Sequence, residues 1–273
     1  MQRLRKTRVR ALLRKPFIGW SDLLAPPACA RCSIAIPRSA TYNRLPVFCS
    51  RCRARLSWSV CHCDPSASCD EPALPCEACA GFAPEIFRCR CAVTYQGEAL
   101  RWIRRFKYPP FGLTGLDPTP LSVMVSLIHE AVRKPSARHP DLIVPIPLHQ
   151  TRLRERGFNP GALLARHAAR ELLSSPASYR LLVRHRATPS QTRLDRDSRL
   201  KNVAGAFTCL ERQAVSGKRI LLVDDVVTTG ATLRSAAGCL LDAGAKSVEA
   251  LCVARASLVG AGEKKKTSLR TTG

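Results

Sequence analysis

The chain has 273 residues, with 44 Lys and Arg against 20 Asp and Glu, which gives a net charge of +24. Its hydrophobic content of 45% is enough to bury a core, and no apolar run is long enough for a membrane-spanning helix. The charge favours polyanionic partners such as nucleic acid, phosphorylated metabolites or an anionic membrane surface. The alternative is that the charge reflects only an arginine-rich composition.

The first twenty residues form a basic tail. Seven Lys and Arg residues lie between Arg3 and Lys15, and the sequence ACA at 28–30 is similar to a signal-peptidase site. The segment between them, 16–24, is short for the apolar part of a signal peptide and contains Asp22. We therefore predict a cytoplasmic protein with a basic N-terminal tail over residues 1–20.

Residues 21–92 form a cysteine-rich segment that lacks the apolar periodicity of a core. Eleven of the fourteen cysteines lie between Cys29 and Cys91, many of them in C-x-x-C pairs. In a reducing compartment this spacing favours metal sites over disulfides. Cys29, Cys32, Cys49 and Cys52 form two such pairs sixteen residues apart, which predicts a closed structural zinc site with four thiolate ligands.

A second zinc site is predicted on Cys76 and Cys79, although its other ligands are ambiguous. The partner segment 61–69 offers Cys61, His62, Cys63 and Cys69. We favour Cys63 together with Cys61 or His62. The remaining cysteines are interpreted as small packing residues: Cys89 and Cys91 alternate along a predicted strand, and Cys209, Cys239 and Cys252 lie in apolar surroundings.

From residue 93 to 258 the sequence predicts a second domain in which strands alternate with helices. The predicted strands are 92–97, 141–147, 180–186, 219–225 and 247–255, and the predicted helices are 98–108, 121–132, 160–173 and 231–244. Short aliphatic strands that alternate with helices indicate a mostly parallel sheet covered on both faces. A long polar stretch lies at 187–202, and residues 259–273 are predicted to be a disordered basic tail.

Two adjacent carboxylates, Asp224 and Asp225, end the predicted strand 219–225, and a loop of small and hydroxylated residues follows at once. Ligands of parallel sheets bind beyond the carboxyl ends of the strands. There the acids could hold Mg²⁺, accept a phosphoryl group, or accept hydrogen bonds from a vicinal diol. The loop residues are Thr228, Thr229, Gly230, Ala231 and Thr232.

This loop distinguishes between the three chemistries. Its backbone N–H groups and hydroxyls, at the start of a helix, suit a phosphate monoester. Carboxylates for a diol beside a cradle for a phosphate predict binding of ribose 5-phosphate. A Walker-B acid would need a G-x-x-x-x-G-K-[ST] loop elsewhere in the chain, and a receiver domain would place its acids on separate strands.

The thirteen residues 220–232, ILLVDDVVTTGAT, resemble the signature of type I phosphoribosyltransferases that binds 5-phosphoribosyl-1-pyrophosphate (PRPP). The resemblance implies that Asp224 and Asp225 bind the ribose 2- and 3-hydroxyls and that 228–232 bind the 5-phosphate of Mg²⁺·PRPP. It also implies the fold class: an α/β phosphoribosyltransferase-like parallel sheet with helices on both faces, preceded here by a cysteine-rich zinc-ribbon domain.

Two further segments, 144–160 (VPIPLHQTRLRERGFNP) and 184–207 (RHRATPSQTRLDRDSRLKNVAGAF), resemble the ComF family of competence-associated proteins. The chain departs from the family wording at Pro160, where Gln is usual, but proline can open a helix at its first position. The residues that match the second segment's pattern are Arg184, Arg186, Thr188, Gln191, Leu194, Arg199, Asn202 and Phe207.

Around PRPP, the turn after strand 142–145, with Pro145 and Ile146, is predicted to face the pyrophosphate. Arg156 is predicted to add positive charge there; for Arg152 and Arg154 a solvated helix face is an equal alternative. The stretch 187–202 matches the position of the loop that closes over PRPP, and closure would keep water from the reacting ribose carbon.

Two functions follow as hypotheses. The first is an enzyme that transfers a 5-phosphoribosyl group to an unspecified acceptor and is linked, through the ComF resemblance, to DNA uptake and other competence proteins. The second is a zinc-ribbon module that binds single-stranded DNA and uses the pocket for a nucleotide or strand end. Phosphate contacts would then come from basic clusters away from the pocket, at Arg3–Lys15, Arg101–Lys107 and Lys264–Lys266.

Overall fold

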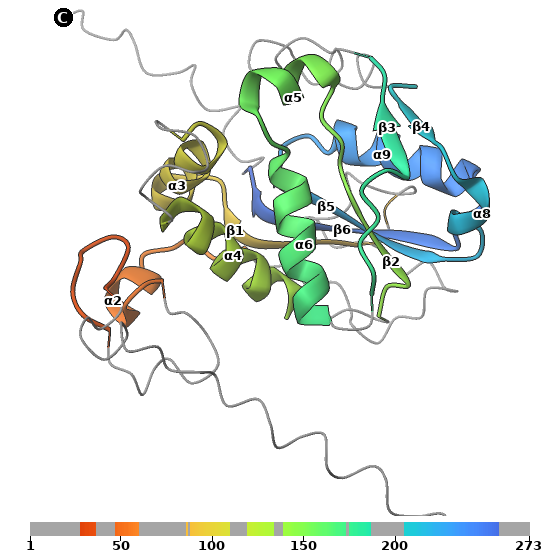
Figure 1. Ribbon diagram of the computed structural model, residues 1–273. Coiled ribbons are helices and arrows are strands. Elements are labelled where there is room, and N and C mark those ends of the chain that lie inside the picture. The colour runs from red at the N-terminus through yellow and green to blue at the C-terminus, as the bar shows by residue number, and fades with distance from the viewer. Residues whose placement is uncertain are drawn as a thin grey trace, which may run out of the picture. The chain divides into compact units, whose positions relative to one another are not determined.

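The computed structural model describes residues 28–36, 47–59, 86, 88–109, 119–133, 139–172, 175–186 and 205–256. The chain divides into two compact units, residues 1–53 and 54–273 (Figure 1). The predicted tails at 1–20 and 259–273 lie outside the described residues. Within the described parts of the chain, no helix combines the length and the apolarity needed to cross a bilayer.

The described residues of the smaller unit include a short helix, α2 (Ser50–Arg53), and a tight loop around Cys29 and Cys32. In the loop the Cys29 N–H donates to the Ile34 carbonyl at 2.9 Å, and the Ser33 N–H donates to the Cys29 carbonyl at 2.8 Å. These two bonds fold the backbone around the C-x-x-C pair. Among the described residues of this unit, Cys29, Ile36 and Cys52 form a buried cluster.

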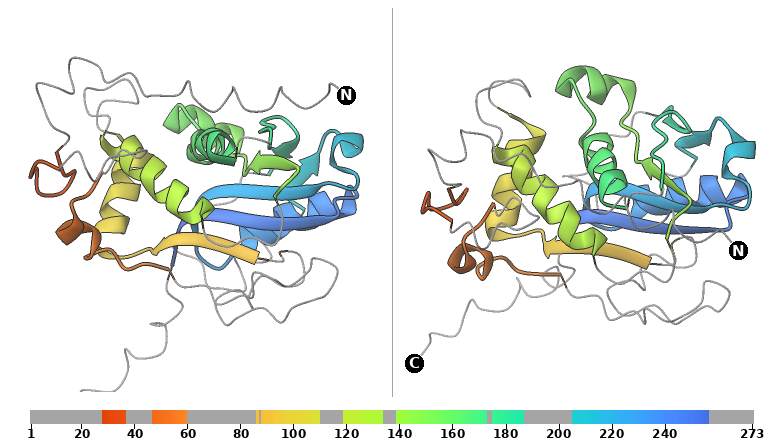
Figure 2. Two further views of the ribbon diagram at one scale, coloured as in Figure 1. Left: turned by 90° about the horizontal axis from the view of Figure 1, so that it is seen from below. Right: turned by 60° about the horizontal axis from the view of Figure 1, so that its bottom comes forward.

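The larger unit is built on a four-stranded sheet whose described strands are all parallel. Its order is β1 (Arg88–Thr94), β6 (Ser247–Arg255), β5 (Arg219–Val227) and β2 (Leu142–Pro145). Helices cover both faces (Figures 1 and 2), as the sequence predicts. The helices on one face are α3 (Gly97–Lys107), α4 (Thr119–Val132) and α6 (Pro160–Leu172), and α9 (Ala231–Asp242) packs on the other.

Most of these elements lie where the periodicity places them, with two differences. Strand β1 begins at Arg88, four residues before the predicted strand, because the buried run Arg88–Val93 extends it in the N-terminal direction. The predicted strand 180–186 shortens to β3 (Leu182–Arg184), which lies outside the parallel sheet. It pairs antiparallel with β4 (Phe207–Cys209), a strand that the sequence did not predict.

The remaining described helices are short: α5 (Gln150–Arg156) follows β2, and α8 (Arg212–Val215) precedes β5. At the amino ends of β2 and β5, the Asp141 carboxylate accepts three hydrogen bonds from Arg219. These come from the backbone N–H at 2.9 Å, from Nε at 3.0 Å and from Nη2 at 2.7 Å. Together they fix the two strands relative to one another.

At the other end of the same strands, α6 approaches the backbone closely. Pro160 opens this helix, as predicted, and Gly161 follows it. A Cβ atom on Gly161 would lie 3.1 Å from the Val223 carbonyl oxygen and 3.4 Å from Oδ1 of Asn159. Because the carbonyl belongs to the central strand β5, it cannot move aside easily, and a side chain at position 161 would strain this contact.

This packing predicts that Gly161→Ala destabilises the protein by about 1 kcal/mol or more, measured by urea unfolding. Gly238→Ala is the matched control, because Gly238 lies inside α9 and its added Cβ would meet no atom within 4 Å. That variant should instead gain about 0.5–1 kcal/mol, since alanine favours a helix interior. Equal stabilities for the two variants would contradict the close approach.

Candidate functional site

The two adjacent carboxylates lie where β5 extends past its neighbour. Strand β2 pairs with β5 only as far as Pro145, which is in register with Val223, and β5 continues to Val227. Asp224 and Asp225 are therefore the first residues of β5 beyond the β2 pairing. On the other side β5 stays paired with β6, with Asp224 opposite Cys252.

Lys107, the last residue of α3, contacts the second of these carboxylates. Its Nζ lies 2.8 Å from Oδ1 of Asp225, which is 6% exposed as a residue. Burial lowers the pKa of Lys107, but the charges of Asp225 and Asp224 more than offset this, so its pKa lies above the ordinary value. Lys107 therefore belongs to the site, and the prediction that the whole Arg101–Lys107 cluster lies away from the pocket is wrong for this residue.

The pKa of Asp224 lies well above the ordinary value of an aspartate. Burial and the neighbouring charge of Asp225 raise its pKa to about 7, although Lys107 and Arg184 act in the opposite direction. Its side chain also accepts a hydrogen bond at 2.8 Å from the Asp225 N–H. Near neutral pH a small change in the surroundings therefore changes the charge of this pair.

The loop after β5 leads directly into α9. Gly230 is the N-cap of α9 and has the left-handed φ of 77°, which favours glycine. The Thr229 hydroxyl lies 3.5 Å from the N–H of Ala231, and Thr228, Thr229 and Thr232 are partly exposed. Residues 228–232 thus bring hydroxyls and the first amides of a twelve-residue helix to the end of β5, next to the carboxylates.

The turn after β2 lies next to the same strand ends. The Ile146 N–H donates to the Val223 carbonyl at 2.9 Å. Asn159 holds the turn from the other side, donating from its side-chain amide to the Ile146 carbonyl at 3.0 Å and accepting from the Gly161 N–H at 2.9 Å. Pro145 and Ile146 are thereby fixed beside β5, one residue short of Asp224 in the sheet register.

Several arginines surround these groups. Arg184, on β3, is close enough to Asp224 for their charges to interact; burial nevertheless lowers the pKa of this arginine. Arg156, at the end of α5, stacks on the Tyr108 ring and donates to its hydroxyl at 3.1 Å. Arg152 lies 3.6 Å from Glu155 on the surface, and Arg154 is exposed.

The predicted closing loop 187–202, with Thr188, Gln191, Leu194, Arg199 and Asn202, lies outside the described residues. Arg184 and Phe207 are the first and last residues of the family pattern that contains this loop. Both are described, and they face one another across the β3–β4 pair. The Arg184 guanidinium lies 5.6 Å from the centre of the Phe207 ring. This contact ties the two ends of the segment together.

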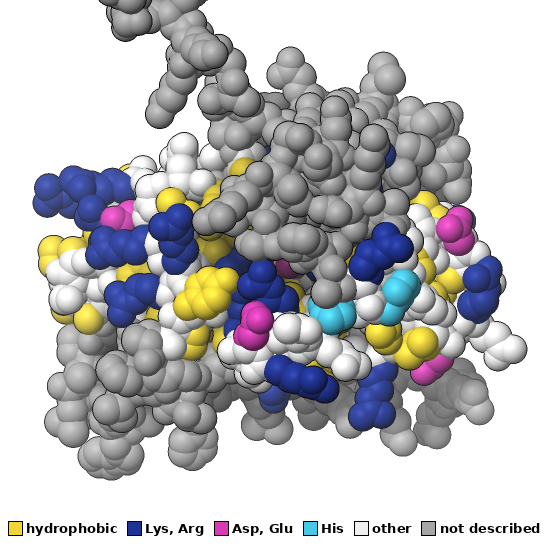
Figure 3. All heavy atoms as spheres, turned by 90° about the horizontal axis from the view of Figure 1, so that it is seen from above, with side chains coloured by type: hydrophobic (Ala, Val, Ile, Leu, Met, Phe, Trp, Pro, Cys, Tyr) yellow, Lys and Arg dark blue, Asp and Glu magenta, His cyan; other side chains and the backbone are white. Residues whose placement is uncertain are grey.

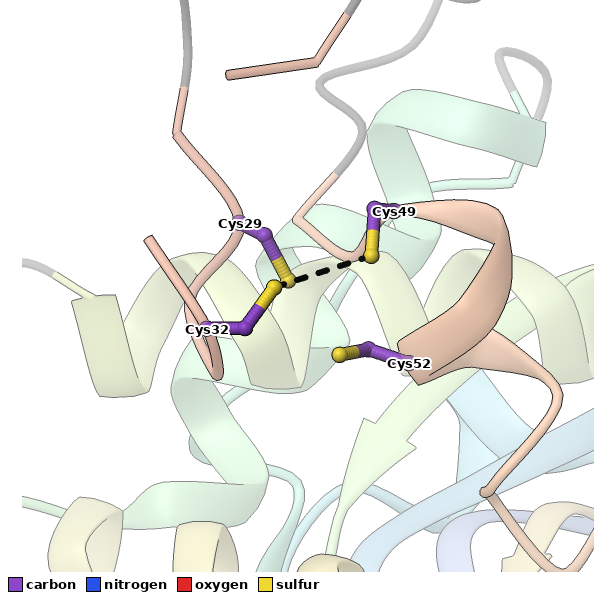
Figure 4. A group of neighbouring side chains, drawn as sticks. All are labelled: Cys29, Cys32, Cys49 and Cys52. Carbon is purple, nitrogen blue, oxygen red and sulfur yellow. Dashed lines mark hydrogen bonds between the residues drawn. The ribbon is translucent and has the colours of Figure 1, made fainter. Parts of the chain in front are cut away.

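The four cysteines of the first predicted zinc site come together in the smaller unit. The Sγ atoms of Cys29, Cys32, Cys49 and Cys52 all lie within 4.8 Å of one another, and those of Cys32 and Cys49 are 3.7 Å apart (Figure 4). Such a group can hold a metal ion. The second predicted site, on Cys61, Cys63, Cys76 and Cys79, lies outside the described residues, as do His62 and Cys69.

Known proteins resemble this chain over much of its length. A family described as "Phosphoribosyl transferase domain" matches residues 159–272. The chain is 30% identical over 155 residues to "Competence protein F" of Haemophilus influenzae, covering 56% of this chain and 66% of that protein. It is 31% identical over 227 residues to "DNA utilization protein YhgH" of Escherichia coli O157:H7, covering 77% of this chain and 98% of that protein. The chain belongs to the ComF family.

Among solved structures, the purine phosphoribosyltransferase of Pyrococcus horikoshii shares 19% identity with this ComF-family chain. The likeness covers 52% of this chain and 78% of that one, with a TM-score of 0.32. The family assignment does not depend on it.

Sequence reasoning missed Lys107 as a member of this ComF-family site, although one local signal was available. Lys107 directly follows Phe106, whose ring packs edge-to-face on Phe158 at 5.8 Å. Phe158 precedes Asn159, the residue that holds the turn after β2. The apolar stripe of α3 predicts that Phe106 is buried, but not which element it meets.

The raised pKa of Asp224 predicts how stability depends on pH. Because the folded chain holds this proton more tightly than the unfolded chain does, the contribution of Asp224 to stability is lost as the pH rises from about 4 to about 7. Asp224→Asn removes this loss. Its free energy of unfolding, relative to wild type, should therefore increase by on the order of 2 to 3 kcal/mol between pH 5 and pH 8.

The measurement is denaturant unfolding of both proteins across this pH range. Asp242→Asn, an exposed carboxylate at the far end of α9, is the control and should show no such increase. A constant difference between Asp224→Asn and wild type would contradict the assignment.

Proposed function

We propose that the chain binds a 5-phosphoribosyl ligand, either PRPP or a nucleotide that carries ribose 5-phosphate. The observation that carries the proposal is the position of Asp224 and Asp225 at the open end of β5, directly before the loop 228–232 that begins α9. The carboxylates would accept hydrogen bonds from the ribose 2- and 3-hydroxyls. The loop amides and hydroxyls would hold the 5-phosphate.

The positions of the basic groups support an anionic ligand. Lys107 and Arg184 both interact with the acidic pair, so cations lie beside the carboxylates. The turn at Pro145 and Ile146 would face the pyrophosphate of PRPP. Arg156, held by Tyr108, would add positive charge there.

Mg²⁺ would accompany PRPP, because the metal neutralises a pyrophosphate and polarises its oxygens. Asp224 and Asp225 offer the oxygen ligands that Mg²⁺ prefers. Transfer to an acceptor would displace pyrophosphate from C1 of the ribose. Among the described residues, the acidic pair and its cations would orient the ribose for that step.

The names of the relatives support a proposal about the biological context of this ligand. Proteins similar to this chain carry the names "DNA utilization protein YhgH" and "Competence protein F". We therefore propose that the chain acts in the cytoplasm in the use or uptake of DNA, alongside other competence proteins. A ribonucleotide would offer the same ribose diol and 5-phosphate as PRPP, whereas the end of a DNA strand would offer the phosphate and a deoxyribose without the 2-hydroxyl.

Zinc would occupy the four-cysteine site of the smaller unit. Four thiolates with no open position match a structural zinc site, and the side chains converge on one point (Figure 4). The cluster that its described residues bury contains Cys29 and Cys52 themselves, so the metal would contribute to the folding free energy of this unit.

Single-stranded DNA is the second candidate ligand, favoured by a basic surface formed by α3 and α5. Arg101, Arg104 and Arg105 are exposed on α3, and Arg154 is exposed on α5. Figure 3 shows several separate groups of Lys and Arg side chains on the described part of one face, with some acidic side chains among them. Tyr108 is 63% exposed beside Arg156 and could stack on a base.

The first prediction concerns PRPP. Calorimetry with Mg²⁺ and PRPP should show binding to wild type and at least a tenfold loss of affinity in Asp224→Asn, because an amide is a poorer acceptor for a diol. Asp242→Asn should bind as wild type does. Equal affinity in all three proteins would exclude the acidic pair from the ligand site. Pyrophosphate release with a panel of nucleobases and amines would then identify an acceptor.

The second prediction concerns zinc. Elemental analysis should find about one zinc ion fewer per chain in Cys49→Ser than in wild type, because a site with three thiolates holds zinc more weakly. Cys239→Ser, a partly buried cysteine on α9, should retain the wild-type content. The same content in all three proteins would overturn the site.

The third prediction concerns DNA. Replacing Arg101, Arg104 and Arg105 with Gln should reduce the salt slope of log affinity for a single strand by about 2, since each neutralised phosphate contributes about 0.7. Arg166→Gln with Arg170→Gln, exposed on α6, is the control for lost charge and should leave the slope near that of wild type. An unchanged slope in the α3 variant would mean that this surface is only solvated.

A further inference from the structure

Three cysteines form a second thiol cluster, inside the larger unit. Cys89 and Cys91 alternate along β1, so their side chains share one face of the sheet. Cys252 on β6 is the register partner of Cys91 and lies on the same face. All three are almost fully buried, at 0%, 1% and 0% exposure, in the core that also contains α9.

The sulfur atoms are as close together as those of the four-cysteine site. The three Sγ atoms lie within 4.8 Å of one another, and those of Cys89 and Cys91 are 3.8 Å apart, against 3.7 Å for Cys32 and Cys49. Thiolates that share one metal ion at about 2.3 Å lie about 4 Å apart in a trigonal arrangement. The backbone of β1 and β6 therefore already sets the spacing that such an ion needs.

A cation also lies beside this cluster. Arg255, on β6, donates to the Cys89 carbonyl at 3.2 Å, so its positive charge is close to the thiols. This charge would attract the thiolates that remain once a metal ion has displaced their protons.

We propose that Cys89, Cys91 and Cys252 form a trigonal site for a soft, thiophilic cation of the Cu(I) class. Among the described residues the cluster contains three sulfur ligands and no carboxylate or imidazole. Three sulfur donors without oxygen select Cu(I) over hard cations. The thiol protons leave to solvent as the ion binds, so affinity increases with pH.

The position of the cluster in the sheet determines how a metal ion reaches it and which groups lie nearby. β1 ends the order of the four described strands, and residues 57–59 pair with its outer edge at Val93. Local opening of this edge would expose Cys89 and Cys91. Cys252 is also in register with Asp224 on β5. The cation would therefore lie one strand away from the carboxylates of the phosphoribosyl site.

The test uses the zinc-loaded full chain, reduced and free of oxygen, titrated with Cu(I) in a competing chelator. Wild type should bind one Cu(I) per chain without releasing zinc, with a sulfur-to-copper charge-transfer band. The variant that carries Ala at positions 89, 91 and 252 should lose this ion and keep its zinc. The matched control, Cys209→Ala with Cys239→Ala, should bind as wild type does.

A single variant covers the case in which the triple variant does not fold. Cys89→Ala leaves two thiols, and its Cu(I) affinity should be at least tenfold weaker than that of wild type. Copper that binds only by displacing zinc, or binds equally in wild type and Cys89→Ala, would overturn the proposal. The result is independent of PRPP binding, which the Cys89→Ala variant should retain.

Discussion

The ion pair between Lys107 and Asp225 is the interaction on which the architecture of the site depends. Two adjacent carboxylates repel one another, and Asp225 is almost buried, so the pair requires a cation close by. That cation comes from the end of α3, more than a hundred residues earlier in the chain. Removing it would leave two acids at the end of β5 without their nearest positive charge, and one of them would take up a proton.

The placement of Lys107 follows from apolar packing. Phe106 is buried against Phe158, and the next residue along α3 then points to the strand ends. Phe158 leads into Asn159 and Gly161, which fix the turn after β2. One aromatic contact thus holds both the cation beside the acids and the turn that flanks them. A ligand at the site would meet three segments whose positions are coupled.

Much of the larger unit could be predicted from the sequence because its elements are locally determined. The aliphatic run 219–223 and the stripe of α9 each specify their own structure, and Ser247–Arg255 forms the strand at its predicted bounds. The contacts of Lys107 and the meeting of Cys91 with Cys252 could not be predicted in this way. They depend on strand order, which places the first and last strands side by side.

The cysteines show the same limit of prediction from the sequence. Spacing alone identified the group of Cys29, Cys32, Cys49 and Cys52, because each C-x-x-C pair forms its own local loop. In the sequence, Cys89 and Cys91 look like any two buried residues that alternate along a strand. The two cysteines form part of a cluster only because Cys252 on β6 lies beside them, and no local sequence pattern predicts this contact.

The triple hydrogen bond between Asp141 and Arg219 has a consequence for the opposite end of the sheet. A slip of one residue between β2 and β5 would turn every side chain of β5 to the other face and exchange the directions of Asp224 and Asp225. The bonds from Arg219 lower the pKa of Asp141 to about 2, so this bond set survives in all but strong acid. Asp141 and Arg219 therefore maintain the geometry of the acidic pair from the opposite end of the sheet. A variant of Asp141 would disturb ligand recognition only through the alignment of the two strands.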